Sequence, residues 1–215
     1  SWGLEAPPVV ADAGYGEISA FRDALAERGL TYVVEVQAQT SAYGLEVTPE
    51  RPPWSGSGRR PARRYRAAPS SLRELALAAG REASSEVTWR EGSRGPMGSR
   101  FLVRRCRPAN IGLRRAHKDR LPVAWLLCEW PEGEAEPVKW WLSNLPAETT
   151  LAELVRLAKL RWRIELDYRE LKDALGLDHF EGRSFRGWHH HVTLVSLAHG
   201  FLTLQRTDPK AHAPA

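Results

Sequence analysis

The sequence is poor in cysteine and has no long apolar run. Its only two cysteines, Cys106 and Cys128, have no second cysteine or histidine at metal-ligand spacing, so we interpret both as reduced and structural and expect no disulfide or zinc site. The longest apolar run, residues 121–128, is far shorter than the roughly 20 residues that a membrane helix needs. No charged-then-apolar leader opens the chain. We therefore expect a soluble, cytoplasmic protein.

Charge is abundant and unevenly distributed along the chain. Of its 215 residues, 42% are hydrophobic, which is enough to form a core, and the formal net charge is +5. Residues 59–120 hold 17 Lys or Arg and 5 Asp or Glu, a net +12, while the rest of the chain carries −7. Such a basic block is typical of a surface that binds a polyanion, although a solvated arginine-rich loop region would have the same composition.

The first 37 residues have the pattern of a strand, a helix and a strand. An apolar run from Val9 ends at Asp12 before a glycine-containing turn, which predicts a buried strand with a carboxylate at its tip. Apolar residues recur at helical spacing over residues 17–30, with Gly29 where the helix would end. Residues 31–36 predict the second strand. We expect the two strands to be parallel and buried on both faces.

The pattern changes at residue 38. Residues 38–69 are rich in Pro, Gly, Ser and Arg and predict an exposed loop, and residues 70–79 predict a short helix with Ser71 as its N-cap. Four segments then alternate apolar and polar residues, as in an antiparallel meander: 86–90, 100–107, 122–130 and 138–144. We interpret residues 38–145 as a β-rich insertion in an α/β domain.

Residues 146–215 are predicted to be helical. Residues 148–176 have the pattern of one long helix that begins after Thr149 or Thr150 and ends at Gly176, and a last helix covers roughly residues 188–205. We expect one stripe of the long helix to pack on the sheet: Leu157, Leu160, Ile164, Leu171 and Leu175. We expect the opposite side to be solvated: Arg163, Asp167, Glu170 and Asp173.

A third stripe on this helix carries Arg161, Glu165 and Lys172. A carboxylate between two bases can hold a cation while the bases bind phosphate oxygens on either side. On spacing alone, a surface Arg–Glu pair with an uninvolved lysine is the simpler explanation.

The sequence around this stripe resembles a known family. The run Leu160-Arg161-Trp162-Arg163-Ile164-Glu165, followed by Lys172, resembles the Y-x2-R-x3-E-x6-K signature of bacterial DDE insertion-sequence transposases, which move DNA through a hairpin intermediate. Ala158 stands at the tyrosine position. Asp12 then resembles the family's second aspartate, because it ends a strand and a β-rich insertion separates it from the glutamate. The resemblance extends over essentially the whole chain.

The resemblance implies an RNase H-like α/β core, incomplete at its N-terminus. Residues 1–37 would supply the second half of the sheet, residues 38–145 the basic β-rich insertion, and residues 146–215 the helices that complete the core. Three carboxylates in this family hold two Mg²⁺ (or Mn²⁺) ions, so Asp12 and Glu165 are the expected metal ligands and catalytic residues. No aspartate precedes Asp12, so we expect the segment with the first aspartate to be missing and this chain alone to be inactive.

The resemblance also implies residues that contact DNA. Arg161 and Lys172 would bind phosphate. Relatives place a tryptophan that stacks on a flipped base on the last strand of the insertion, where Trp140 and Trp141 stand, and one of these two should point to the core.

Two further groups of residues are candidate DNA contacts. Five arginines are expected to bind the DNA backbone: Arg59, Arg60, Arg63, Arg64 and Arg66. Three consecutive histidines point about 100° apart on a helix and cannot chelate one ion, so we interpret them as phosphate contacts at a helix N-terminus or as plain surface. They are His189, His190 and His191.

The expected partners are double-stranded DNA, as transposon ends and as target, and a second copy of the chain in a homodimer on paired ends. The expected location is the bacterial cytoplasm, at the nucleoid. Two alternatives stay open. The chain could be a non-catalytic DNA-binding transposase remnant, or a metal-dependent nuclease of the same fold without strand-transfer activity.

Overall fold

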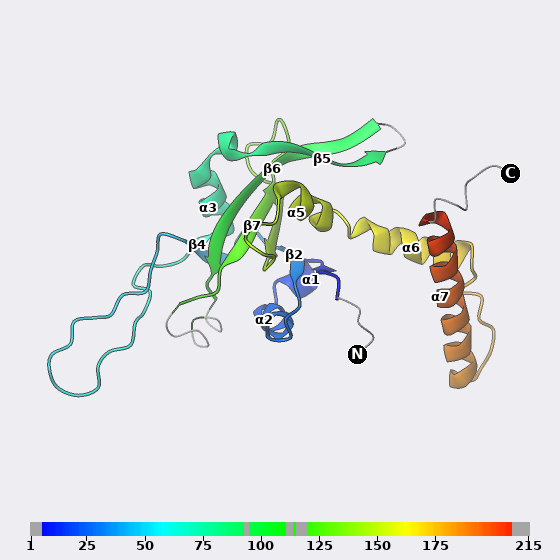
Figure 1. Ribbon diagram of the computed structural model, residues 1–215, viewed down its shortest axis with the longest axis horizontal. Helices are drawn as coiled ribbons and strands as arrows, with labels where there is room; N and C mark the ends of the chain where they lie inside the picture. The colour runs from blue at the N-terminus through cyan, green and yellow to red at the C-terminus, as the bar shows by residue number, and fades with distance from the viewer. Residues whose placement is uncertain (1–5, 93–94, 111–113, 115–119, 208–215) are drawn as a thin grey trace. The chain divides into compact units, whose positions relative to one another are not determined.

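The computed structural model describes residues 6–92, 95–110, 114 and 120–207. The chain divides into two compact units, Ser1–Leu160 and Arg161–Ala215, which are described separately here. The first unit is a curled, mixed sheet with helices on both faces, and the second is a pair of helices (Figure 1). The predicted α/β class is confirmed, and the sheet is consistent with an RNase H-like fold.

The described strands form one eight-stranded sheet in the order β1-β2-β8-β7-β6-β3-β4, with β5 paired to β6 outside this path. Their bounds are β1 Val9–Ala11, β2 Tyr32–Val36, β3 Ser41–Gly44, β4 Ser70–Ser71, β5 Ser85–Gly92, β6 Gly95–Pro108, β7 Ala124–Glu129 and β8 Lys139–Ser143. The pair β1–β2 is parallel, and the other pairs are antiparallel. In this order β1 is the terminal strand of the sheet.

The predicted strand–helix–strand pattern at the start of the chain is confirmed. Strand β1 leads through α1 (Ala13–Gly16) and α2 (Ser19–Glu27) into β2, which lies parallel to β1. Gly29 has a φ of +69°, and the Leu30 amide donates to the Leu25 carbonyl at 3.0 Å, so a left-handed glycine closes α2. The expected burial is met by β2 except at half-buried Glu35, whereas all of β1 is half-buried.

A second glycine lets α1 lie directly against β2. A Cβ atom on Gly16 would collide with the backbone carbonyl of Glu35. The Gly16 carbonyl also accepts a hydrogen bond from the guanidinium of Arg22, whose side chain is buried. The turn after Asp12 is therefore held close to the sheet.

The predicted meander is confirmed by β5, β6, β7 and β8, and the short helix by α3 (Leu72–Ala79). Helix α3 begins at Ser71, whose hydroxyl accepts from the Glu74 amide at 3.1 Å while the Glu74 carboxylate accepts from the Ser71 amide at 2.8 Å. A short 3-10 helix, Arg81–Ala83, follows it. The prediction of one loop over residues 38–69 is wrong in part, because β3 is a buried strand paired with β6.

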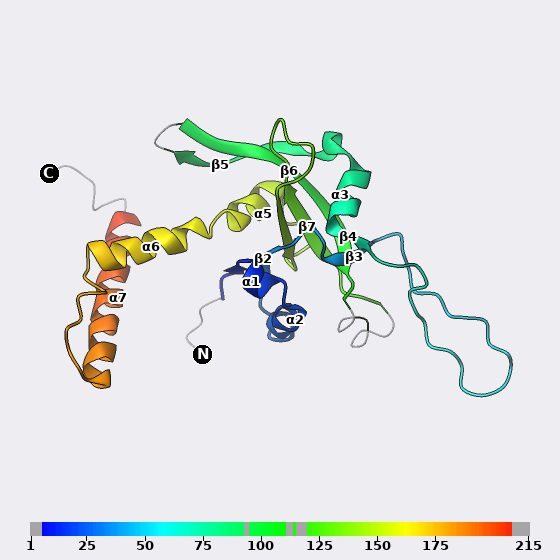
Figure 2. The ribbon, with the colours of Figure 1, turned by 180° about the vertical axis from the view of Figure 1, so that it is seen from behind.

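Helices cover both faces of the sheet. Side chains of α2 and α3 pack on one face, in a core cluster that includes Val34 and Leu142. Helix α5 (Leu151–Ala158) packs on the other face, in a cluster that includes Val33 and Trp141. Figure 2 shows the same layers from behind. Strands β2 and β8 are therefore covered on both sides.

The prediction of one long helix over residues 148–176 is wrong. Helix α5 begins after Thr150, whose hydroxyl accepts from the Glu153 amide at 3.2 Å, and a turn over residues 159–161 separates it from α6 (Trp162–Asp173). In this turn the Leu160 amide donates to Leu157 O at 3.0 Å, three residues back, which interrupts the α-helical pattern. Of the predicted apolar stripe, Leu157 packs on the sheet from α5, whereas Ile164 on α6 is exposed.

The second unit consists of α6 and α7 (Phe185–Thr207), which confirms the predicted last helix. Arg206 of α7 donates to the Glu170 carboxylate at 2.8 and 3.0 Å, and the His199 ring lies 3.4 Å from the same carboxylate. A contact also joins the start of the connecting segment to α7: a ring nitrogen of His191 lies 3.0 Å from the Gly176 carbonyl oxygen. No helix in the described part of the chain combines the length and apolarity needed to cross a bilayer.

Strands from residues 1–37 and from residues 38–145 share one sheet, since β2 pairs with β8 in the register Val34↔Leu142. The predicted assignment of residues 38–145 as an insertion into a core formed by residues 1–37 and 146–215 stays a prediction.

Candidate functional site

Asp12 lies where the sequence predicts, at the end of β1. Its backbone is extended, with φ −78° and ψ 178°, and it is the N-cap of α1: its Oδ1 accepts from the Tyr15 amide at 3.4 Å. A Cβ atom on Gly14 would lie 3.1 Å from Oδ1, so the glycine leaves room for the half-buried carboxylate. A strand tip that leads into a helix start is a common place for a functional acid in an α/β sheet.

Continued by one residue beyond β1, the parallel register with β2 would bring a second carboxylate, that of Glu35, opposite Asp12. Val10 pairs with Val33 and Ala11 with Val34, where the paired register ends, and Asp12 and Glu35 are the residues that follow. Side chains alternate along a strand, and Val10 and Val33 both face the α5 side, so Asp12 and Glu35 share that side. Glu35 was not among the site residues predicted from the sequence. The available signal was a single acid inside the otherwise apolar run of β2.

Arg161, Glu165 and Lys172 remain on a single helix although the predicted long helix is divided. Arg161 is the N-cap of α6, Glu165 lies in its first turn and Lys172 in its last turn. Glu165 and Lys172 are exposed and Arg161 is half-buried. The structure therefore keeps the predicted base–acid–base stripe.

The predicted solvated side of α6 is confirmed in part: Arg163 and Asp173 are exposed, whereas Asp167 and Glu170 contact α7. Asp167 and Glu170 are half-buried and lie 3.9 and 3.4 Å from the His199 ring. The hydrogen bonds from Arg206, with a smaller effect of His199, hold the pKa of Glu170 below its usual value. On a helix of 3.6 residues per turn, Glu165 lies opposite this acidic side. The Arg161–Glu165–Lys172 stripe therefore faces away from α7.

Asp12 belongs to the first unit and Glu165 to the second. Their approach to a common metal site stays a prediction. Within residues 6–92, 95–110, 114 and 120–207, no group of three or more His, Cys, Asp or Glu side chains is arranged to hold a metal ion.

Both candidate stacking tryptophans are buried. Trp140 is 5% exposed and packs in the cluster under α2 and α3, whereas Trp141 is 4% exposed and packs in the cluster under α5. We expected one of these two rings to point to the core. Both do, because helices cover both faces of β8. Base stacking by either ring stays a prediction and would require the ring to leave its core cluster.

Trp141 is part of a cage around Lys159 that sequence analysis did not find. The Lys159 ammonium lies 2.6 Å from the Glu129 carboxylate and 4.5, 5.6 and 5.7 Å from the ring centroids of Trp89, Phe101 and Trp141. Both charged side chains are largely buried, at 17% and 10% exposure. Since Lys159 is the C-cap of α5, the cage fixes the end of this helix on the sheet.

The five candidate DNA-binding arginines all lie on the exposed segment between β3 and β4: Arg59, Arg60, Arg63, Arg64 and Arg66. Other arginines of the basic block are used inside the fold. Arg100 donates to the Ser84 carbonyl at 2.5 Å, and buried Arg107 donates to the Leu121 carbonyl at 2.5 Å. In the described part of the basic block, the arginines of this segment are exposed, whereas Arg100 and Arg107 bind backbone carbonyls within the fold. Part of the block, residues 93–94, 111–113 and 115–119, lies outside the described residues.

The three histidines of α7 point in different directions. The His191 ring contacts Gly176, and the His189 ring packs edge-on against Phe185 at 4.2 Å and Trp188 at 4.9 Å, while His190 is exposed. Their predicted phosphate contacts stay untested. Both cysteines are free and buried, and burial raises the pKa of each thiol to about 12.

Residues 1–96 match a family model described as a DDE superfamily endonuclease. The match includes Asp12 and Glu35 and ends before Glu165. It supports a relation to DDE transposase-like nucleases, which act on DNA and generally use divalent metal ions. No curated protein matches the chain.

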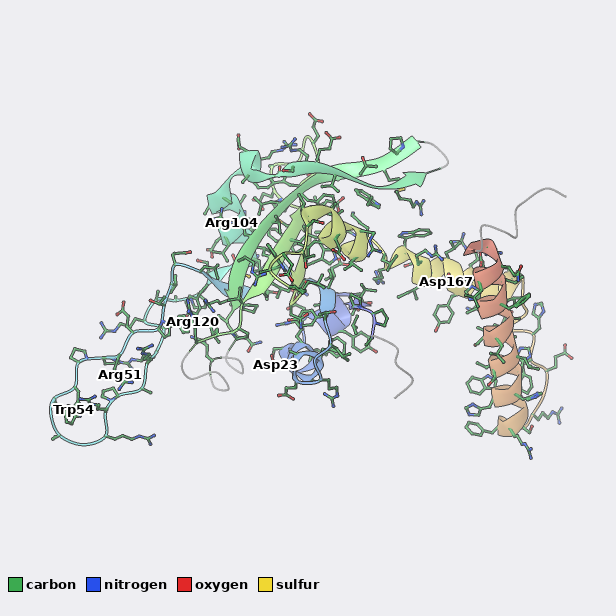
Figure 3. All side chains as sticks on the ribbon, viewed as in Figure 1. Asp23, Arg51, Trp54, Arg104, Arg120 and Asp167 are labelled. Carbon is green, nitrogen blue, oxygen red and sulfur yellow. The ribbon has the colours of Figure 1, made fainter. Side chains whose placement is uncertain are left out.

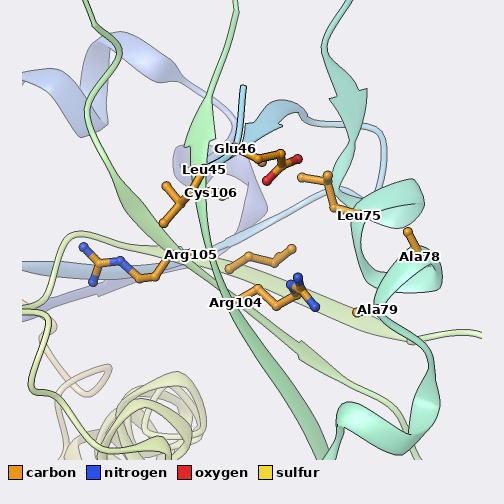
Figure 4. Close-up of a pocket in the computed structure, with 10 residues that line it drawn as sticks. Leu45, Glu46, Leu75, Ala78, Ala79, Arg104, Arg105 and Cys106 are labelled. Atoms are coloured by element: carbon orange, nitrogen blue, oxygen red, sulfur yellow. The ribbon is translucent and has the colours of Figure 1, made fainter. Parts of the chain in front are cut away.

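The first unit also contains a cavity of about 270 Å³ between α3 and the sheet, lined among others by Glu46, Leu75, Arg104 and Cys106 (Figure 4). None of the residues predicted from the DDE resemblance lines it.

Proposed function

We propose that this chain is the part of a bacterial DDE transposase that carries two of the three catalytic carboxylates, Asp12 and Glu165, and that it acts in Mg²⁺-dependent strand cleavage and strand transfer at transposon ends. The observation that carries the proposal is the place of Asp12. It stands at a strand tip inside the segment that matches the DDE endonucleases, in a chain that also contains the Arg161–Glu165–Lys172 spacing.

The side chains fit the chemistry that such a site requires. Mg²⁺ and Mn²⁺ prefer oxygen ligands, and Asp12 and Glu165 would supply carboxylate oxygens. When bound, a pair of such ions activates a water or a 3′-hydroxyl and stabilises the leaving oxygen. Arg161 and Lys172 would bind phosphate oxygens on either side of Glu165. The exposed arginines from Arg59 to Arg66 would hold the DNA backbone without reading its sequence.

Because Asp12 and Glu165 are only two of three carboxylates, we propose that the chain by itself binds DNA and a divalent ion without cutting DNA. In the working enzyme we propose a homodimer on paired transposon ends. The second candidate function is a non-catalytic DNA-binding remnant. The arginines do not distinguish the two candidates. Arg100 and Arg107 bind within the fold in either case, and the exposed arginine segment would bind DNA in either case.

Metal-directed backbone cleavage distinguishes the two candidates without requiring DNA cleavage. With added hydrogen peroxide and ascorbate, Fe²⁺ that replaces Mg²⁺ reduces the peroxide to hydroxide and a hydroxyl radical, which cuts the polypeptide next to the metal, and ascorbate returns the Fe³⁺ to Fe²⁺. We expect cuts near both residue 12 and residue 165, suppressed by excess Mg²⁺. Asp12→Asn and Glu165→Gln should each remove both cuts, whereas Asp178→Asn, an exposed acid outside the proposed site, should change neither. A chain without Mg²⁺-sensitive cuts at these positions would be a remnant.

A further inference from the structure

The segment between β3 and β4 is fixed at its base. The Tyr65 ring stacks on the buried Tyr43 ring, with centroids 4.4 Å apart and planes at 12°. The Tyr65 hydroxyl accepts from the Leu121 amide at 3.2 Å, and Glu50 and Arg64 exchange two backbone hydrogen bonds of 3.0 Å. The segment beyond these contacts extends away from the sheet (Figure 1).

We call residues 51–66 the arginine arm. The arm contains six arginines and no acidic residue. Apart from Pro52, Pro61 and the Tyr65 ring that anchors it, every residue of the arm is exposed. The Glu50 carboxylate at its base lies 3.7 Å from the Arg66 guanidinium. A surface with this charge, held out from the core on a fixed base, is complementary to a polyanion.

The arm also presents an aromatic ring to solvent. Trp54 is 43% exposed and lies near the end of the arm, beyond Arg51 (Figure 3). The Arg60 guanidinium lies 5.3 Å from the centroid of its ring. Such a contact covers one face of an indole and leaves the other for a ligand. By contrast, the indoles of Trp140 and Trp141 are inside the core.

We propose that the arginine arm binds DNA at a site with an unpaired base, with Trp54 stacked on that base and the surrounding arginines on the adjoining phosphates. A tryptophan beside basic side chains suits this ligand, because every base offers a flat face and every nucleotide a phosphate. The proposal rests on the proposed function in requiring that the chain binds DNA. It assigns the stacking to a residue that neither the family signature nor the family match singles out.

The arm fits DNA better than it fits an anionic lipid surface. Interfacial membrane binding needs a continuous apolar face in addition to basic residues. Trp54 is the single large apolar side chain of the arm outside its anchored base, and the prolines Pro52, Pro53 and Pro61 prevent a regular amphipathic helix. One flat ring among six guanidinium groups matches a base among phosphates.

The test compares DNA binding by the full chain in EDTA, so that metal chemistry plays no part. The probes are a fully paired duplex and the same duplex with one bulged 2-aminopurine, whose fluorescence reports stacking. Trp54→Ala should weaken binding to the bulged duplex by about 5- to 150-fold, because stacking on one base contributes about 1–3 kcal/mol. Binding to the paired duplex should change less than about twofold. Trp54→Phe should retain most of the affinity and of the fluorescence change.

Phe201→Ala is the matched control, because this aromatic ring is 61% exposed and lies on α7, outside the arm and away from the three candidate histidines. It should leave both affinities unchanged. The proposal is overturned if Trp54→Ala binds both duplexes like the parent, if it weakens both equally, or if Trp54 is needed for binding to phosphatidylserine vesicles and not to DNA. A parent chain that binds neither duplex overturns the proposed function as well, whereas DNA binding that is independent of Trp54 overturns only this inference.

Discussion

The Lys159 ammonium and the Glu129 carboxylate form a largely buried ion pair of 2.6 Å between the end of α5 and the end of β7. The aromatic rings around the ammonium exclude water from it on several sides. Arg161, the N-cap of α6, follows two residues later, so the pair holds the chain on the sheet just before the helix that carries Glu165.

Removal of one partner of this pair should be costly, because the other charge stays buried alone. We expect Lys159→Met to lower the free energy of unfolding by about 3 kcal/mol, measured by urea denaturation. The double variant Lys159→Met/Glu129→Leu should recover most of this loss, since it leaves no unpaired charge. Lys139→Met, which removes an exposed lysine opposite Glu129, should stay within about 0.5 kcal/mol of the parent. Equal losses in the Lys159 and Lys139 variants would show that the cage contributes little.

Gly16 and Gly200 should respond to alanine in opposite directions. Gly16→Ala would collide with the Glu35 carbonyl, so we expect a loss of more than about 1 kcal/mol in the free energy of unfolding. A Cβ on Gly200, inside α7, meets nothing within 4 Å, so Gly200→Ala should stabilise the helix by about 0.5–1 kcal/mol. Thermal unfolding of both variants by circular dichroism measures this, and a tolerated Gly16→Ala would contradict the close packing of α1 on β2.

Acid should loosen the contact between α6 and α7. The hydrogen bonds from Arg206 lower the pKa of Glu170 in the folded chain, so this pair stabilises the fold above the unfolded pKa of glutamate, and the stabilisation is lost as the pH falls through the lower folded value. We expect an NMR titration of the Glu170 carboxyl to give a pKa lower than that of an ordinary glutamate, and Arg206→Ala to return it towards the ordinary value. An unchanged titration in that variant would show that Arg206 does not hold the carboxylate in solution.

The salt dependence of DNA binding tests the arginine arm as a whole. If about six to eight basic side chains contact phosphates, log affinity should fall with log salt at a slope of about −5 to −7. Replacement of Arg59, Arg60, Arg63 and Arg64 by alanine should flatten the slope by up to about 4, because fewer counterions are released. An unchanged slope would mean that these arginines form only a solvated loop.

The sequence predicted those elements whose signals are local. The apolar run to Asp12, the capping residue Ser71 and the alternating segments of the meander lead directly to β1, α3 and β5–β8. Strand β3 was missed because its four residues lie in a segment dominated by Pro, Gly, Ser and Arg, and its burial comes from pairing with a distant strand, β6.

The break between α5 and α6 has no local signal either. Residues 159–163 include no glycine or proline that would predict a turn, and the contact that Lys159 makes in this turn is with Glu129, thirty residues away. The burial of both Trp140 and Trp141 follows from helices on both faces of β8, which a strand pattern alone does not reveal. Of the candidate site, the sequence singled out Asp12 and Glu165, whereas the position of Glu35 relative to Asp12 is inferred only from the parallel register of β1 and β2.

The most direct test of the account is a crystal structure of the chain bound to DNA and Mn²⁺, with the metal located by anomalous scattering. We predict that the carboxylates of Asp12 and Glu165 lie within about 8 Å of each other and share the metal site. Manganese held elsewhere, with the two carboxylates on opposite faces of the sheet, would contradict the assignment of this chain to a DDE catalytic centre.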